Sequence, residues 1–528
     1  MFSPSSQTFI EVDAGITAEI ICLRMLWLWL FTFLLLFTIH VRALYLVSEG
    51  QTVLDAEPLA EEGVLSSFVA QPARGWTVED ILDAAETANA DVWHVSPSHV
   101  DVYFSTIRNY HESQLKAANL SESTRIIDRS LLSATPYPTS APSWNLSSLS
   151  NTTFHASYHP LYEVENFMEE LATLNPHLVQ LANLGHSAEG REMFAIKISR
   201  DTLSQKSGSS AQGKAKTGIV VTGAQHAREW VATSTALYLA HALVASAAEP
   251  YAMSSLLDDH SAVRPPSRVS STFIHEFYII PLPNPDGYAY TWEHDRLWYK
   301  NRQILGPNEK CVGLDMNRQG IPLDGHKWKP TARFPRLKAA DPSTSNSRGG
   351  IDPCTQWYPG HRPFQSPEVN NIANYITTLP ALQVYIDLRS YGQMLSAPFS
   401  YSCKKMPKDA ENLSEAALGA TRAIKLVHGT TFTTGGLCSM LYKAPGNVVD
   451  WMYAKAGVPY SYAVHLRDTG TYGFSLPAEW IRPVGEETAS MIQFLAEFTP
   501  GGRKCALPLH PQPECSADNL LSAAELPV

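Results

Sequence analysis

The chain has 528 residues, which is room for about three average domains, although α/β proteins often use such a length for one. Apolar residues make up 44% and charged residues 17%, a balance typical of a globular protein. The formal net charge is −11 and no basic patch is evident, so nucleic acid is excluded as an expected partner.

Residues 1–43 are predicted to contain a signal peptide. The apolar run Met25–Ile39 suits a signal-peptide core and is short for a membrane span, but Arg24 is the only basic residue before it. Two alternatives stay open: translation could begin at Met25, or the apolar segment could be kept as an N-terminal anchor. The protein would lie at a membrane only if this segment is not cleaved. Four Asn-x-Ser/Thr sequons fit a secretory route; they begin at Asn119, Asn145, Asn151 and Asn412.

Residues 44–128 are predicted to form a small, separate α+β unit. A helix is expected to begin after Thr77, whose side chain is a good N-cap with Asp80 three residues on. Residues 91–104 are expected to form two short strands joined by a Ser-Pro turn. Residues 129–157 are rich in Ser, Thr, Pro and Asn, which predicts a solvated linker and a site for a processing protease.

Residues 158–500 are predicted to form an α/β domain, followed by a tail at 501–528. The helices are expected at 162–174 and 230–247, and residues 258–271 resemble an inserted surface loop. Strands are expected at 193–198, 218–223, 277–282, 382–388 and 459–464. These elements predict a mixed, mostly parallel sheet with helices on both faces.

A strand-to-helix turn in this domain carries His226 and Glu229. Imidazole and carboxylate are both good zinc ligands, and α/β proteins place their chemistry at such turns. An isolated His-x-x-Glu is more often a surface pair, so the surrounding sequence has to support the interpretation.

Further motifs follow in a fixed order: Asn284–Tyr288, Arg296–Lys300, Cys311–Arg318, Ile386–Tyr391, Leu441–Trp451 and His465–Phe474. Together with the His226 turn, this series resembles the zinc carboxypeptidases of the pancreatic A/B type over residues 158–499. The Trp93, Pro97-Ser98 and Val100-Asp101-Val102 pattern resembles their activation segment, a prodomain that shields the cleft.

The resemblance implies a zinc ion held by His, Glu and His with a water in the fourth position, a Glu base and an oxyanion-binding Arg. It assigns His226 and Glu229 to the metal, Asn317 and Arg318 to a carboxylate clamp, and Val449 to the base of an apolar specificity pocket. It places Arg296, Ser390, Tyr391 and Tyr442 along the substrate groove. It also implies disulfides between Cys311 and Cys354 and between Cys403 and Cys438, while Cys505 and Cys515 could close a loop in the tail.

Three positions depart from the family pattern. Arg389 replaces the third ligand, His465 replaces the general base and Tyr299 replaces the oxyanion Arg. Arginine only donates hydrogen bonds, so it cannot ligate zinc. This combination is similar to the inactive fungal homologues linked to cell-wall biogenesis.

We therefore expect a monomeric, secreted, inactive homologue in the medium or cell wall, with the vacuole as another destination. It is expected to bind the C-termini of peptides or glycoproteins without cleaving them. The alternatives are a weak zinc carboxypeptidase that uses His465 and releases apolar or aromatic residues, and a structural wall or membrane protein with a vestigial cleft.

The sequence leaves two arrangements of the metal position open. In one, His465 joins His226 and Glu229 as a replacement zinc ligand. In the other, no zinc binds and Arg389 pairs with Glu229 as an internal cation.

Overall fold

The computed structural model describes residues 63–72, 76–87, 90–105, 121–127, 144–200, 216–258, 274–307, 309–320 and 352–499. The predicted signal segment, the sequon at Asn119, most of the predicted loop at 258–271, and Cys505 and Cys515 lie outside these residues. Within them, no helix is long and apolar enough to cross a membrane.

Residues 63–127 contain a small α+β fold, called the N-terminal unit below. Strands β1 (Gly63–Val69), β2 (Asp91–Val95), β3 (His99–Ser105) and β4 (Ser121–Ile127) form an antiparallel sheet in the order β2-β3-β1-β4, with helix α2 at Val78–Thr87. The amide of Asp80 donates to Thr77 Oγ1 at 3.2 Å, and the amide of Thr77 donates to the Asp80 carboxylate at 2.7 Å. The predicted helix start and strand pair are confirmed.

The large domain is built on an eight-stranded mixed sheet in the order β11-β10-β12-β9-β7-β8-β6-β5. The four central strands β12, β9, β7 and β8 run parallel, as expected. The strands are β5 (Val179–His186), β6 (Glu192–Ile198), β7 (Lys216–Thr222), β8 (Ile274–Ile280), β9 (Leu382–Arg389), β10 (Met394–Ala397), β11 (Thr433–Gly436) and β12 (Tyr460–His465).

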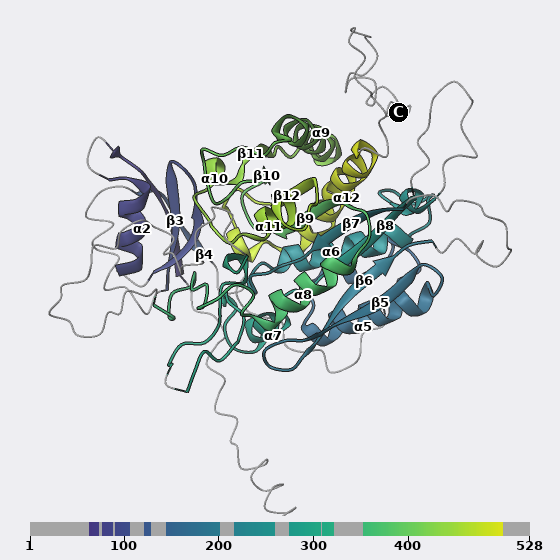
Figure 1. Cartoon of the computed structure of the whole chain (residues 1–528), viewed down its shortest axis with the longest axis horizontal. Helices are drawn as coiled ribbons and strands as arrows, with labels where there is room; N and C mark the ends of the chain where they lie inside the picture. Colours follow the sequence, from purple (N-terminus) through teal and green to yellow (C-terminus); the bar gives the residue numbers. More distant parts are fainter. Residues whose placement is uncertain are drawn as a thin grey trace, which may run out of the picture. The chain divides into compact units, whose positions relative to one another are not determined.

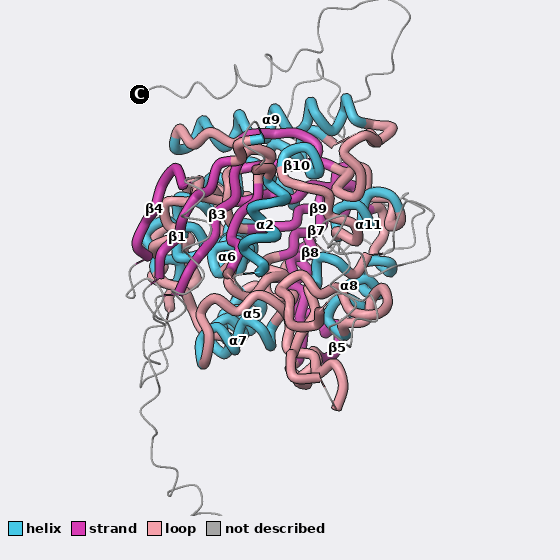
Figure 2. The backbone as a smooth tube through the Cα atoms, turned by 90° about the vertical axis from the view of Figure 1, so that its left-hand side faces the viewer, coloured by secondary structure: helices cyan, strands magenta, loops and turns pink. Residues whose placement is uncertain are grey.

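Alternating side chains of the buried strands pack on opposite faces of this sheet. Ile219 and Val221 of β7 join one core with α5 (Leu161–Leu174), α6 (Trp230–Val244), α7 (Pro285–Glu293), α9 (Ala410–His428) and α12 (Ile481–Phe498). Val220 joins the other core with α8 (Pro367–Thr378), α10 (Leu437–Met440) and α11 (Val448–Ala454). Figure 1 shows α9 near the β10–β11 end of the sheet and α5 near β5, and Figure 2 shows β7–β9 between α6 and α8.

Three predicted boundaries are wrong. The strand expected at 277–282 spans Ile274–Ile280. The helix expected to run to residue 247 ends at Val244, because Ala245 adopts an extended backbone (φ −64°, ψ 154°). The linker expected at 129–157 ends earlier, because Leu146, Leu149 and Phe154 are buried in the main core. We call residues Trp144–Ser157 the entry segment.

Both disulfides in the described residues are those that the resemblance implied. Cys311 pairs with Cys354 and Cys403 pairs with Cys438, with Cα–Cα distances of 5.1 and 4.9 Å. The sequon residues Asn145, Asn151 and Asn412 are exposed, and their glycosylation stays a prediction.

Candidate functional site

The candidate site lies where the parallel strands of the central sheet end. Strand β7 leads into the turn that carries His226 and Glu229, β9 ends at Arg389, and β12 ends at His465. Arg389 and His465 are register partners in the parallel β9–β12 pair, so they sit at the same level of the sheet. Ligands of α/β proteins bind at this carboxyl edge.

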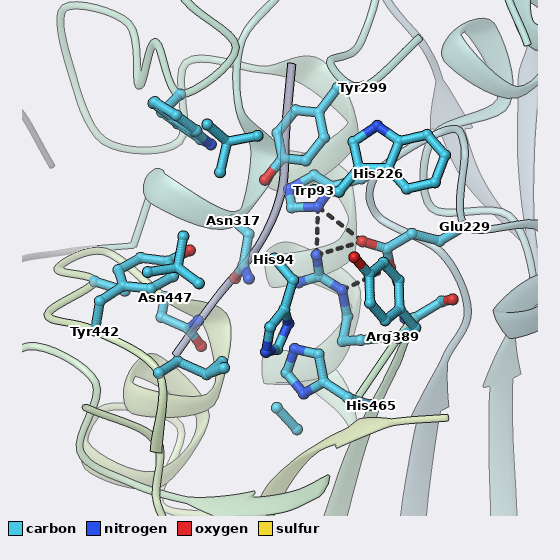
Figure 3. A pocket seen from close by; sticks show the side chains of 18 of the residues that line it. Trp93, His94, His226, Glu229, Tyr299, Asn317, Arg389, Tyr442, Asn447 and His465 are labelled. Carbon is cyan, nitrogen blue, oxygen red and sulfur yellow. Dashed lines mark hydrogen bonds and ion pairs between the residues drawn. The ribbon is translucent and has the colours of Figure 1, made fainter. Parts of the chain in front are cut away.

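The guanidinium of Arg389 points at the two predicted metal ligands (Figure 3). Its Nε donates to Glu229 Oε2 at 2.9 Å and its Nη2 donates to Glu229 Oε1 at 2.9 Å. Nη2 also makes a close contact with Nδ1 of His226. This is a bidentate, charge-assisted pair, the strongest kind of side-chain hydrogen bonding, and all three residues are buried.

The ion pair fixes the charges of both partners. Burial alone would raise the pKa of the Glu229 carboxyl, but the Arg389 guanidinium outweighs burial and holds that pKa well below its ordinary value of 4.5. Burial would lower the pKa of Arg389, but Glu229 raises it well above its ordinary value. A carboxylate and a guanidinium therefore face each other across the whole physiological pH range.

The Asp315 carboxylate lies behind the imidazole ring of His226. The ring Nε2 lies 2.9 Å from Asp315 Oδ1, and a carboxylate only accepts, so Nε2 carries the proton. On the other side of the ring, Nδ1 lies 3.0 Å from Glu229 Oε1 and in close contact with Arg389 Nη2, so both residues enclose this nitrogen. A carboxylate behind a histidine is the usual support of a metal-binding imidazole. The sequence reasoning missed Asp315, although it stands two residues before Asn317 in a quoted motif.

The donor set does not fit a zinc ion. Zinc would have to contact His226 Nδ1 and the Glu229 carboxylate, and the Arg389 guanidinium already lies against both. The third-ligand position supplies a cation instead of a lone pair. Across the described ranges, no group of three or more His, Cys, Asp or Glu side chains is arranged to hold a metal ion. The ion pair between Arg389 and Glu229 that one of the two arrangements requires is present, and the absence of bound zinc stays a prediction.

His465 occupies the predicted general-base position but, among the described residues, lacks the hydrogen bond that would orient a general base. Its Nδ1 is buried and has no hydrogen-bond partner in the described part of the chain. Burial and the nearby Arg389 lower the pKa of His465 to about 3, so the ring is neutral at neutral pH. A base acting near pH 7 works best with a pKa close to that value.

Tyr299, at the position of the oxyanion Arg, covers one face of the His226 ring. Its ring stacks on His226 with a centroid separation of 3.6 Å. It offers no cation to a developing oxyanion, and burial raises the pKa of its hydroxyl.

The residues of the predicted carboxylate clamp lie together. Arg318 Nη2 donates to the Tyr442 hydroxyl at 2.8 Å, and Asn317 accepts the amide of Val448 at 3.1 Å. Arg318, Asn317, Tyr442, Ser390 and Tyr391 all line the same cavity as His226. A guanidinium there suits recognition of a carboxylate.

Two predicted groove residues lie elsewhere. Arg296 does not line the cavity, because it donates to the carbonyls of Arg228 and Phe474 and stacks over Trp230. Val449, in α11, is fully buried in the core and does not line the cavity. The apolar wall of the cavity instead comes from Leu437, Leu441, Ala444 and Ala463.

The N-terminal unit closes the cleft. Residues Val92–Val95 line the cavity, which has a volume of only about 70 Å³. Arg228 donates to Asp91 at 2.6 Å and to the carbonyl of Val92 at 3.3 Å. Typical ligand pockets hold roughly 300–1,000 Å³, so the closed cleft has space for a few waters and not for a peptide.

Comparisons with known proteins agree with this architecture. Residues 164–491 match the zinc carboxypeptidase family. A crystal structure of thrombin-activatable fibrinolysis inhibitor is similar, with a TM-score of 0.66 and 25% identity over 83% of this chain and 98% of that one. Carboxypeptidase A from Helicoverpa armigera shares the fold, with a TM-score of 0.60 and 23% identity over 83% and 98% of the two chains.

Several curated fungal relatives carry the name inactive metallocarboxypeptidase ECM14. The protein from Paracoccidioides brasiliensis is 30% identical over 80% of this chain and 71% of its own length. The protein from Sclerotinia sclerotiorum is 32% identical over 66% of this chain and 55% of its own length.

The chain therefore belongs to the zinc carboxypeptidase family. Within that family it is a homologue of proteins named as inactive.

Proposed function

We propose that this protein is a secreted, non-catalytic carboxypeptidase homologue that binds peptide C-termini without cleaving them, with a role in cell-wall organisation. The observation that carries the proposal is the bidentate pairing of Arg389 with Glu229 in contact with His226. It places a guanidinium against the groups that zinc would have to contact, while the Arg318 clamp and the apolar wall beside it remain.

The alternative of a weak zinc carboxypeptidase has less support. It needs a metal, a base and an oxyanion cation, and these positions hold Arg389, a neutral His465 and Tyr299. A positioned base contributes about 10²–10⁴ in rate and an oxyanion donor about 10²–10³, so the missing groups leave little catalysis.

The test is peptide binding after the linker has been cut and the N-terminal unit displaced, because that unit fills the cleft. Peptides ending in a free leucine should bind, and the same peptides with an amidated end should not. Arg318→Ala should weaken binding by roughly 1.5–3 kcal/mol, the range for a hydrogen bond to a charged group. Arg302→Ala, outside the cavity, is the matched control.

Calorimetry gives the affinities, and mass spectrometry of the recovered peptide shows whether a residue has been removed. Equal affinity for the free and amidated peptides would contradict the binding proposal. Release of the terminal residue would favour the weak hydrolase.

A further inference from the structure

The entry segment Trp144–Ser157 is clamped to the core by buried polar groups. His241 of α6 donates from Nε2 to the carbonyl of Leu146 at 2.9 Å. Arg482 of α12 donates to the carbonyl of Leu149 at 2.9 Å and also contacts that of Thr152. The segment therefore depends on anchors from two helices as well as on its apolar side chains.

Two histidines join the entry segment to α6 through one buried hydrogen bond. His155 Nε2 lies 3.1 Å from His241 Nδ1, and both side chains are almost completely buried. Because His241 donates from Nε2 to a carbonyl, its Nδ1 is an acceptor and His155 donates to it. In this direction the bond exists only while His241 is neutral. A proton on His241 Nδ1 would set two N–H groups against each other unless the proton of His155 moved to its own Nδ1.

The charged groups around the two histidines do little to stabilise a proton on either ring. Arg482 is a fixed cation beside both histidines, and His159 is a further neighbour of His155. The carboxylates nearby are already engaged, Glu163 with His159 and Glu249 with the hydroxyl of Ser148 and the amide of Ser150. Burial lowers the pKa of His241 to about 4 and that of His155 well below its ordinary 6.5.

We propose that the His155–His241 pair is a pH-sensitive clasp that holds the entry segment on the core at neutral pH and releases it in acid. Release would expose the entry segment to a processing protease. An acidic compartment would therefore favour cleavage within this segment.

The direction follows from proton linkage. A histidine whose pKa is depressed in the closed state stabilises that state above its free pKa of 6.5, and the stabilisation is lost as pH falls from 6.5 towards 4. One such histidine makes the opening constant of the segment about 20-fold larger at pH 5 than at pH 7.

Hydrogen exchange of the full chain, corrected for intrinsic exchange rates, measures this opening. Amides of the entry segment should lose about 20-fold in protection between pH 7 and pH 5, while amides of α8 that exchange by local opening should keep theirs. Equal protection of the entry segment at both pH values would overturn the proposal, and this comparison needs no variant.

A double variant tests the assignment to these histidines. His155→Gln with His241→Gln keeps polar side chains that do not titrate, so protection should become independent of pH. His294→Gln changes an exposed histidine and should retain the wild-type pH dependence. Acid opening that persists in the double variant would overturn the clasp.

Discussion

Arg389 supplies a cation to two buried acidic side chains, which also accept hydrogen bonds from Gln225 and from the amide of Ser390. Its Nη1 lies 3.5 Å from Asp387, and its Nε and Nη2 bind Glu229. In a family site a metal ion balances such a carboxylate. Here a protein cation does so, and it is tethered covalently, so the balance does not depend on the metal supply.

Arg389→Gln should lower the free energy of unfolding by about 3–5 kcal/mol, because removing one partner strands a buried charge. Arg389→Gln with Glu229→Gln should recover most of that loss, since neither partner is then charged. Without Arg389, burial raises the pKa of Glu229 above its ordinary 4.5, so the loss should be largest at high pH and should shrink as pH falls through that raised pKa, where the carboxyl of the variant takes up a proton.

Urea denaturation of the two variants at several pH values gives these free energies. Arg200→Gln removes an exposed ion pair with Asp258 and should cost less than about 1 kcal/mol. A double variant as unstable as Arg389→Gln alone would show that Glu229 is not the stranded partner.

At the scale of the elements, much of the framework could be predicted from local pattern. The β-branched run before His226 and the helix formers after Glu229 placed β7 and α6, because side-chain periodicity and propensity act locally. Side-chain periodicity also predicted that His226, Glu229, Arg389 and His465 lie at the ends of strands.

The contacts between elements could not be predicted in this way. The entry segment looks like a solvated linker by composition, yet Leu146, Leu149 and Phe154 find an apolar surface made by distant helices. The direction in which Val449 points depends on how α11 packs, and the partner of His226 depends on where η7 (Met316–Arg318) places Asp315. These are tertiary effects that a single sequence does not display.

At the scale of the whole described fold, the N-terminal unit shares a core with the large domain. Trp93 packs against Phe474, and the Tyr391 hydroxyl donates to Asp101 at 2.8 Å. Arg228 is almost fully buried against Asp91. Separation would expose aromatic surface and leave two acidic side chains and one arginine without these partners.

We therefore expect the N-terminal unit to stay bound after the linker is cut between residues 128 and 143. Asp91→Asn should speed its dissociation, because breaking a buried, hydrogen-bonded charge pair costs about 2–5 kcal/mol. Glu79→Gln, an exposed change on α2, should leave dissociation unchanged.

Size-exclusion chromatography of the cut protein shows whether the two fragments co-elute. Immediate separation of the wild-type fragments would contradict the shared core.

The most direct test of the Arg389 assignment is the zinc content of the purified protein, measured by mass spectrometry for wild type and Arg389→His. The substitution removes the internal cation and restores a His, Glu, His set with His226 and Glu229. Wild type should contain almost no zinc and Arg389→His should contain stoichiometric zinc, while Arg467→His, whose arginine pairs with Glu487, should resemble wild type. Stoichiometric zinc in wild type that disappears in Glu229→Gln would contradict the account.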